Sequence, residues 1–422
     1  MDQAGDDDVG VNWAGNLQYS AGRLVQPRSL EELQEQVAGS TRIKPVGSRH
    51  SFNAIADTDG DLLSLAGMPR VFELDEQARS VTIDAGMRYG ELAVRLRERG
   101  WALENMASLP HITVVGSVAT GTHGSGNRVP PLSAQVNAVG LVTADGELRR
   151  FARGDEEFGG AVVNLGALGV VIRISLDVVP GFEGRQDVYD GLSWDGVFDD
   201  FEELTSAAYS VSLFTRWSGE RFGHAWLKST RGGELPEAGQ PPETIQGVKP
   251  LGRHIGLAEG PAEAATEQTG IWGSWDERLP HFKLNFTPSN GTELQSEYLL
   301  PREQAVEGMR RMRALGDRMA PHLMVSEVRT MAADDQWLSA AYGRETVGFH
   351  FTWRQHVDEV AALLPALEDE LLPLGARPHW GKLFTTTQVA GLYPRFVDFQ
   401  ALAQRTDPGG KFRNEFLETM LG

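Results

Sequence analysis

The sequence contains no cysteine among its 422 residues. This absence excludes disulfide frameworks, thiolate zinc sites, iron–sulfur clusters and cysteine nucleophiles. Basic residues are also scarce: 39 Lys and Arg stand against 58 Asp and Glu, which gives a formal net charge of -19 at pH 7. Such a chain repels nucleic-acid phosphates and anionic membrane surfaces, so we expect no nucleic-acid or membrane partner. A neutral small substrate fits this charge better.

The standard nucleotide and hydrolase motifs are missing as well. There is no Walker loop G-x-x-x-x-G-K-[ST] and no Rossmann fingerprint, since "GSGNRV" from Gly124 carries Val129 where the third glycine should stand. No G-x-S-x-G nucleophile elbow occurs either. These absences exclude the common P-loop, dinucleotide-fold and serine-hydrolase classes.

Targeting and membrane signals are also lacking. The acidic start "MDQAGDDDVG" has neither the basic nor the apolar part of a signal peptide. The most apolar run, "LGALGVVIRISLDVV", is too short for a membrane span and contains Arg173. We therefore expect a cytoplasmic protein, and a monomer.

The first third of the chain mixes helices and strands without a regular βαβ series. "SLEELQEQV" predicts a helix capped by Ser29, with Glu32 at capping-box spacing. "SVTIDAG" predicts a strand, "YGELAVRLRERG" a helix closed by Gly100, and Asp145-Gly146 the turn of a hairpin. "LGALGVVIRISLDVVP" ends the region with a strand. The pattern is that of an α+β fold.

From residue 181 onward the pattern predicts an antiparallel sheet with helices on one face. We expect a surface excursion at Gly232 to Gly270, a turn at Asn290-Gly291 and a helix from Pro301 to a stop at Pro321. The predicted strands are "SVSLFTRW", "RFGHAWLKS", "HFKLNF", "LMVSEVRTM" and "TVGFHFTWR". The domain boundaries expected are 12–180, 181–370, and a C-terminal segment 371–422 that returns to the first domain.

Two glycine-rich loops are the main candidates for ligand binding. They are "VGSRHSFN", from Val46, and "ASLPHITVVGSVATGTHGSG", from Ala107. Small residues let a backbone approach a ligand closely, and consecutive N–H groups then bind an anion without Lys or Arg. Either loop alone is explained as a turn. The pair favours a buried dinucleotide pyrophosphate.

His50, in the first loop, has three possible roles: metal ligand, acid–base catalyst or covalent attachment point. A metal site would need further ligands at short spacing, and none lies nearby. A catalytic triad lacks its nucleophile elbow. Attachment would need a reactive imidazole held against a cofactor ring. An ordinary hydrogen-bonded histidine also fits the residue taken alone.

Longer motifs resemble a known family. "PVGSRHS", "NMASLPHITVVGSVATGTHGSG" and "LGALGVV" follow in the order seen in the FAD-binding (PCMH-type) domain of the vanillyl-alcohol-oxidase superfamily. Downstream, "LQSEYLLPRE", "SEVRT", "HFTW", "RPHWGK" and "DPGGKF" resemble the alditol (xylitol or sorbitol) oxidases of that superfamily. The resemblance covers nearly the whole chain. It implies a two-domain flavoprotein with an antiparallel substrate (cap) domain.

The resemblance also implies where FAD binds. In that superfamily the His of the first loop often bonds covalently to the flavin, so His50 is the expected attachment point. Arg49 stands where this loop usually carries Gly. Ala107 is expected near the flavin, where small residues shape oxygen access. The implied FAD-binding residues are Pro45, Val46, Gly47, Ser48, Arg49, His50, Ser51, Ser108, Thr113, Gly116, Thr120, Gly121, Thr122, His123, Val171 and His379.

Three short motifs of the second domain carry the substrate chemistry. Glu327 and Arg329 share one face of a strand, as do His350 and Thr352. Taken alone, these motifs are typical of a surface salt bridge and a half-buried strand, and "RPHWGK" of a basic turn. The resemblance instead implies that polyol hydroxyls are bound by Ser108, Glu327, Arg329, Thr352 and Lys382.

We assign catalytic roles to three of these residues. Arg329 and Lys382 would favour an alkoxide-like C1 oxygen and the anionic reduced flavin. Glu327 would orient Arg329 and accept a proton or hydrogen bond from a substrate hydroxyl. The resemblance thus implies an FAD-linked oxidase of alditols that gives an aldose and H₂O₂, with O₂ as the second substrate and no metal. The alternatives are a sugar-lactone oxidase or dehydrogenase and a non-catalytic flavin- or sugar-binding protein.

Overall fold

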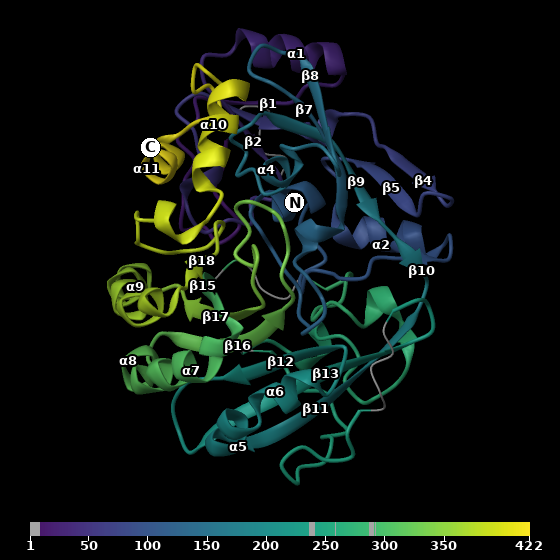
Figure 1. Ribbon diagram of the computed structural model, residues 1–422, viewed down its shortest axis with the longest axis vertical. Coiled ribbons are helices and arrows are strands. Elements are labelled where there is room, and N and C mark those ends of the chain that lie inside the picture. The colour runs from purple at the N-terminus through teal and green to yellow at the C-terminus, as the bar shows by residue number, and fades with distance from the viewer. Residues whose placement is uncertain (1–8, 236–240, 258, 287–290, 292) are drawn as a thin grey trace.

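The computed structural model describes residues 9–235, 241–257, 259–286, 291 and 293–422. Figure 1 shows two parts. The upper part combines the N-terminal and C-terminal segments, and the lower part is formed by the middle of the chain. The α+β fold class predicted from the sequence is confirmed.

A small parallel sheet begins the upper part. Its order is β1 (Arg23–Val25), β3 (Asp61–Ser64) and β2 (Ile43–Val46). Helix α1 (Leu30–Gly39) begins where predicted, because the Ser29 side chain accepts a hydrogen bond from the Glu32 N–H and fills one free donor of the first turn. Strand β2 leads directly into the loop that carries His50.

A five-stranded antiparallel sheet completes the upper part. Its order is β4 (Phe72–Asp75), β5 (Ser80–Asp84), β9 (Val170–Asp177), β7 (Val136–Val142) and β8 (Leu148–Ala152). The predicted hairpin is confirmed: Val142 pairs with Leu148, and Gly146 in the turn has a φ of 87°. Helices α2 (Tyr89–Arg97), α3 (Val114–Ala119) and α4 (Phe158–Val162) and the short pair β6 (Trp101–Ala102) and β10 (Val179–Pro180) also belong to this part.

An eight-stranded antiparallel sheet forms the lower part. Its order is β14 (Gly273–Ser274), β11 (Glu183–Ser193), β13 (Arg221–Arg231), β12 (Ser210–Thr215), β16 (Leu323–Met331), β17 (Thr346–Arg354), β15 (Glu293–Pro301) and β18 (Arg377–Pro378). Strands β12, β13, β16 and β17 lie where the alternating pattern predicts them. Since side chains alternate along each strand, one face can bury an apolar core while the other carries polar groups.

Helices cover the outer face of this sheet (Figure 1). They are α5 (Trp194–Asp199), α6 (Phe201–Ser206), α7 (Ala305–Ala314), α8 (Gly316–Met319) and α9 (Val357–Leu371). Val328, Phe349 and Phe351 of the sheet share a buried apolar cluster with Met309 and Leu367 of these helices. The opposite face is thereby left for the polar residues of the site.

Some predictions for the second domain were wrong. "HFKLNF" forms no strand but a turn, with isolated pairing of Phe282 to Ala265. The predicted helix does not begin at Pro301, because that residue still pairs with Thr346 as the end of β15. A 3₁₀ turn follows it, and the helix is broken at Leu315 into α7 and α8. The predicted turn at Asn290-Gly291 lies partly outside the described residues.

The C-terminal segment packs against the upper part (Figure 1). It contains α10 (Phe396–Thr406) and α11 (Glu415–Leu421). The Lys44 ammonium of β2 is fully buried and donates to the carbonyl oxygens of Leu165, Gly166 and Phe412, at 3.2, 3.1 and 3.0 Å. One side chain thus joins three distant stretches of sequence. The boundaries 12–180, 181–370 and 371–422 stay a prediction.

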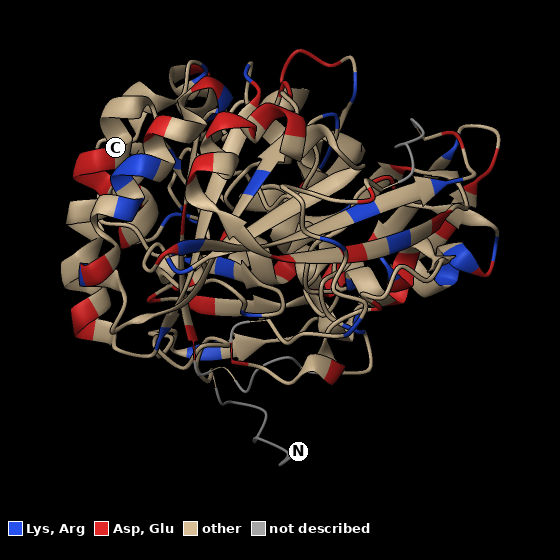
Figure 2. Cartoon of the chain, turned by 90° about the horizontal axis from the view of Figure 1, so that it is seen from below, with Lys and Arg blue, Asp and Glu red and all other residues tan. Residues whose placement is uncertain are grey.

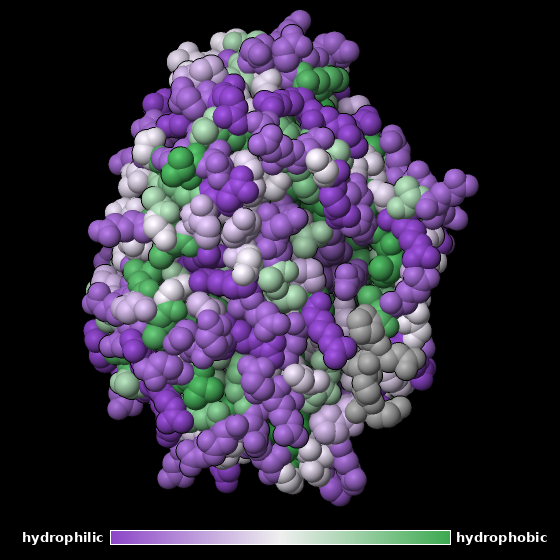
Figure 3. Space-filling model, in the orientation of Figure 1, coloured by the Kyte–Doolittle hydropathy of each residue, from purple (hydrophilic) through white to green (hydrophobic). Residues whose placement is uncertain are grey.

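The molecular surface is predominantly polar. Figure 2 shows acidic segments on many of the peripheral helices and loops, in keeping with the net charge of -19. The face seen in Figure 3 is mostly hydrophilic, with hydrophobic residues in small separate groups. Among the described helices, none combines the length and apolar character that crossing a membrane requires.

Candidate active site

A cavity of about 670 Å³ lies between the two glycine-rich loops and the polar face of the eight-stranded sheet. Residues of both loops line it, including His50 and Thr113. So do Glu327 and Arg329 of β16 and Lys382, which follows β18. The structure therefore brings the predicted cofactor loops and the predicted substrate residues to one place.

Backbone groups of the first loop are available to a ligand. Within the described part of the chain, the N–H groups of Ser48, Arg49, His50 and Ser51 donate to no protein acceptor. Four consecutive free donors beside a cavity can bind a pyrophosphate without a cationic side chain directed at it. Gly47 is needed for the close approach of the second loop, because a Cβ there would lie 2.4 Å from the Thr113 Oγ1.

Arg49 occupies a left-handed backbone conformation, with a φ of 58°. Glycine reaches this region without strain, which explains physically why a loop of this shape usually carries Gly here. The Arg49 side chain turns away to the N-terminal segment, where it donates to the Val9 carbonyl at 2.6 Å and lies over the Tyr19 ring. The substitution therefore leaves the loop intact.

His50 lies against aromatic rings at the cavity wall. Its ring centroid is 4.3 Å from that of Trp13 and 5.6 Å from that of Phe52. Burial lowers its pKa to about 3, and the positive charge of Lys382 acts in the same direction. The imidazole is therefore neutral at pH 7, the form that has a free nitrogen lone pair.

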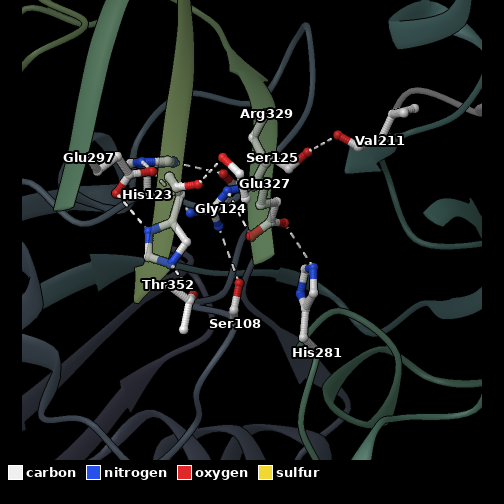
Figure 4. Close-up of polar contacts among 12 residues, drawn as sticks. Ser108, His123, Gly124, Ser125, Val211, His281, Glu297, Glu327, Arg329 and Thr352 are labelled. Carbon is white, nitrogen blue, oxygen red and sulfur yellow. Dashed lines mark hydrogen bonds and ion pairs between the residues drawn. The ribbon is translucent and has the colours of Figure 1, made fainter. Parts of the chain in front are cut away.

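Strand register places three ionisable side chains in one row. His350 of β17 pairs with Glu327 of β16 on one side and with Glu297 of β15 on the other. Glu297 is fully buried, and Figure 4 shows it beside His123 of the second loop. Sequence reasoning missed Glu297. Its signal was a single carboxylate in the otherwise uncharged strand segment "QSEYLLP".

Glu297 accepts contacts from three cationic or imidazole groups. The Lys382 Nζ lies 2.6 Å from its Oε2, and the His123 Nε2 and an Arg329 nitrogen lie 3.0 and 3.2 Å from its Oε1. Burial alone would raise the pKa of Glu297, but Lys382 and His123 hold it well below its usual range. Glu297 is therefore ionised, and its charge is compensated locally.

Lys382 and His350 form the second part of this network. The Lys382 Nζ is 2.7 Å from the His350 Nδ1, and the His350 Nε2 is 3.1 Å from the Thr352 hydroxyl. Burial lowers the pKa of His350 to about 4, with a further contribution from Lys382. Neutral His350 accepts from Lys382 at one nitrogen and donates to Thr352 at the other. The fold thereby fixes the tautomer.

Arg329 connects this network to the second loop. It donates to the Ser108 hydroxyl at 3.2 Å, and its Nε lies 3.5 Å from Glu327 (Figure 4). Glu327 is also 3.0 Å from the His281 Nε2, without the angles of a hydrogen bond. Arg329 and His281 hold the pKa of Glu327 far below its usual value although burial opposes them. Ser108, Glu327 and Arg329 are thus brought together as predicted.

Known proteins share this sequence and fold. Residues 21–152 match a family model described as an FAD binding domain, and residues 288–420 one described as D-arabinono-1,4-lactone oxidase. An alditol oxidase of a Streptomyces species is 48% identical over 97% of this chain and 98% of its own length. The chain belongs to the alditol oxidase family of FAD-binding flavoproteins. It is an oxidoreductase.

Less similar proteins with other names also align with this chain. An L-gulono-1,4-lactone dehydrogenase of Mycobacterium tuberculosis is 30% identical over 97% of this chain and 98% of its own length. Among solved structures, a cholesterol oxidase of B. sterolicum superimposes on 99% of this chain and 97% of its own chain. The TM-score is 0.78 and the sequence identity 13%. This last likeness concerns the fold alone, which is that of the vanillyl-alcohol-oxidase superfamily.

Nearly all of the binding residues that the resemblance to alditol oxidases implies line the cavity. All five implied substrate-binding residues line it, as do fifteen of the sixteen implied FAD-binding residues. Gly121 is the exception: it lies at the end of α3 with a φ of 72°, where it turns the chain rather than lining the cavity. The excursion predicted at Gly232 to Gly270 is also not purely a surface feature, because its Leu257, Gly260 and Pro261 line the cavity.

Proposed function

We propose that this alditol oxidase family member oxidises the terminal C1 hydroxyl of alditols such as xylitol or sorbitol. The alditol and O₂ are converted to the aldose and H₂O₂. The observation that carries this proposal is a charge-balanced group: Glu327, Arg329 and Lys382 line the cavity that the FAD loops also line, and the buried Glu297 contacts both cations from behind the wall. Such a group offers both donors and acceptors, which a neutral, many-hydroxyl substrate requires.

The residues facing the cavity divide the work of binding. A buried polar group left without a partner costs about 1–3 kcal/mol, so each substrate hydroxyl needs a matching group. Ser108 and Thr352 supply hydroxyls, Glu327 supplies acceptor oxygens, and Arg329 and Lys382 supply cationic donors. The hydroxyls are thereby positioned along the polar face of the sheet, with the C1 oxygen against the two cations.

The cations act on the reacting oxygen. Removal of the hydroxyl proton leaves negative charge on the C1 oxygen, and fixed cations in a water-poor site stabilise that charge strongly. Arg329 is buried and Lys382 is mostly buried, and each contacts a carboxylate. FAD, held by the two loops, would supply the hydride acceptor and the reducing equivalents for O₂.

The loop residues fit FAD by two features of this chain: the free N–H groups of Ser48 to Ser51 and the close approach that Gly47 allows. We propose that His50 is the covalent attachment point, because its neutral imidazole lies on the cavity wall. Acid precipitation tests the attachment. Yellow colour should stay in the protein pellet, and it should move to the supernatant in His50→Ala.

The function itself is tested by mixing the purified, flavin-loaded protein with xylitol or sorbitol without oxygen. The flavin absorbance near its visible maximum should bleach, and admission of O₂ should restore it with release of H₂O₂. A flavin that no alditol bleaches would contradict the proposal. Bleaching by sugar 1,4-lactones in preference to alditols would favour the second candidate, to which the match of residues 288–420 lends support.

A further inference from the structure

The Glu297 carboxylate accepts hydrogen bonds from three side chains that line the cavity, those of His123, Arg329 and Lys382. We propose that Glu297 is a positioning residue that fixes the Lys382 ammonium and directs its one remaining N–H toward the substrate C1 oxygen. The inference rests on the proposed function for the identity of the substrate. The orientation of Lys382 is a property of the chain itself.

The donor count of Lys382 supports this orientation. An ammonium has three N–H donors and no acceptor. One donor is used by the Glu297 Oε2 at 2.6 Å and a second by the neutral His350 Nδ1 at 2.7 Å. No other hydrogen bond of Lys382 Nζ is present in the described chain, and Lys382 lines the cavity. The third donor is therefore free for a ligand.

Electrostatics make Glu297 the group on which the charge of Lys382 depends. Burial lowers the pKa of Lys382, and Glu297 is the largest influence that raises it. Arg329 lowers the pKa of Lys382 further, and Glu327 raises it, but less than Glu297 does. Since His350 lies between Lys382 and Thr352 as a neutral group, it adds no compensating charge. The titratable and charged groups near Lys382 are Glu297, Glu327, Arg329, His350, His379, His123 and His50.

The position of Glu297 is itself tightly defined. Its other oxygen is shared by His123 and Arg329, which come from the second loop and from β16. Gly348 of β17 leaves room for it, because a Cβ there would lie 3.3 Å from the Glu297 Oε1. The carboxylate thus cannot turn away from Lys382 without abandoning two further partners.

Glu297→Gln tests the proposal, because it keeps the shape but removes the charge. A buried Lys382 beside Arg329 then loses its counter-charge and gives up its proton at lower pH. We expect the basic limb of the pH profile for anaerobic flavin reduction by xylitol to move down by at least one pH unit. Above the wild-type basic limb, reduction should slow about ten-fold for each pH unit that the limb moves, because the protonated fraction of Lys382 falls by that factor. Lowering the pH should restore much of the lost rate.

Glu368→Gln is the matched control. Glu368 is a buried carboxylate of the same part of the fold, but its partners are the Tyr298 hydroxyl and Thr385 rather than cations. This control should lower the unfolding temperature without moving the pH profile. Glu297→Asp keeps the charge and should retain the wild-type basic limb with a slower rate, which provides a second reading if Glu297→Gln folds poorly.

The outcomes separate the inference from the proposed function. A pH profile unchanged in Glu297→Gln, or shifted equally in Glu368→Gln, would overturn the role of Glu297 while leaving alditol oxidation intact. If no alditol reduces the wild-type flavin, the proposed function fails. The pH titration of the substrate-free flavin spectrum then still tests Glu297, because Lys382 and His50 line one cavity. A shift of at least one pH unit in this titration between Glu297→Gln and the wild type supports the inference, and no shift refutes it.

Discussion

The two walls of the cavity offer different kinds of groups to a ligand. The loop wall presents small residues and backbone N–H groups, with no carboxylate between Gly47 and Ser51. The sheet wall presents the charges of Glu327, Arg329 and Lys382, and the buried Glu297 behind it helps to balance the two cations. Backbone donors are held by the loop conformation and need no counter-charge. Buried side-chain charges are costly unless they are paired, so the sheet wall must be built as a network.

This difference predicts that the two walls fail differently when they are altered. A change on the loop wall should reduce the amount of flavin bound. A change on the sheet wall should reduce turnover while flavin remains. The predictions below test this separation, beginning with the largest effect.

Replacement of Arg329 by Met should reduce turnover about 10²–10³-fold, as expected when a fixed donor to a developing oxyanion is removed. Flavin content should stay near that of the wild type, because no loop backbone is disturbed. Steady-state kinetics and the ratio of visible to ultraviolet absorbance measure the two quantities. Thr352→Ala, which removes only a neutral hydroxyl, serves as the milder comparison. Parallel loss of flavin and turnover in Arg329→Met would contradict the assignment of flavin binding and turnover to different walls.

Stability should fall as the solution is acidified from about pH 6.5 toward pH 4. The folded protein keeps His50, His281 and His350 neutral, with pKa values of about 3, 4 and 4 against a usual value of 6.5. The unfolded chain binds these protons first, so the free energy of unfolding decreases through this window. For His350 the loss is at most about 3 kcal/mol, from about 1.4 kcal/mol per pKa unit.

Thermal unfolding at pH 7, 5.5 and 4.5 measures this effect, and His350→Gln isolates one of its contributors. The variant should lose less stability between pH 7 and pH 4.5 than the wild type. Identical pH dependence of the two proteins would show that His350 does not remain neutral in the fold.

Gly47→Ala should weaken the initial, non-covalent binding of FAD about ten-fold, since ~1.4 kcal/mol of lost binding corresponds to a factor of ten, and flavin content should fall with it. The added Cβ would meet the Thr113 Oγ1 at 2.4 Å, and a β-branched side chain cannot turn aside freely. Thr113→Ala in the same chain removes that oxygen and should restore part of the flavin. Equal flavin in Gly47→Ala and the wild type would mean that the loops can separate without cost.

Arg49→Gly should have the smallest effect. Glycine relieves a left-handed conformation that costs a side-chain residue about 1–2 kcal/mol, but it gives up the hydrogen bond to Val9. The unfolding free energy should therefore stay within about 1 kcal/mol of the wild type. Arg49→Ala keeps the strain and loses the bond, so it should be the less stable variant. Denaturant unfolding of both variants checks the order.

Local sequence patterns were sufficient for much of the fold. The alternation of "SVSLFTRW" and the Ser29 cap predict β12 and α1 because strands and helix starts depend on neighbouring residues. "HFKLNF" alternates equally well but forms no strand, since within the described residues its pairing is limited to the isolated bridge between Phe282 and Ala265. Pro301 reads as a helix start, yet the pairing of Pro301 with Thr346 keeps it in the sheet.

The site was only partly predictable for the same physical reason. The residues of "SEVRT" and "HFTW" are visible as motifs because each pair lies on a single strand. Glu297 gains its role from the register of β15 on β17, which places it beside His350 and near Lys382. Register between strands 50 residues apart is not encoded in any short window. A buried carboxylate shared by several cations was therefore beyond a reading of one sequence.

The Lys44 contact has a consequence for the order in which the protein is made. The Lys44 ammonium bonds to Phe412, 368 residues further along the chain. Ribosomes add about 5–20 residues per second, so these two partners are synthesised roughly 20 to 70 s apart. Until Phe412 is synthesised, the Lys44 ammonium of the strand that leads into the His50 loop lacks one of its three carbonyl partners. We therefore expect flavin capture by this loop to follow synthesis of the segment around Phe412.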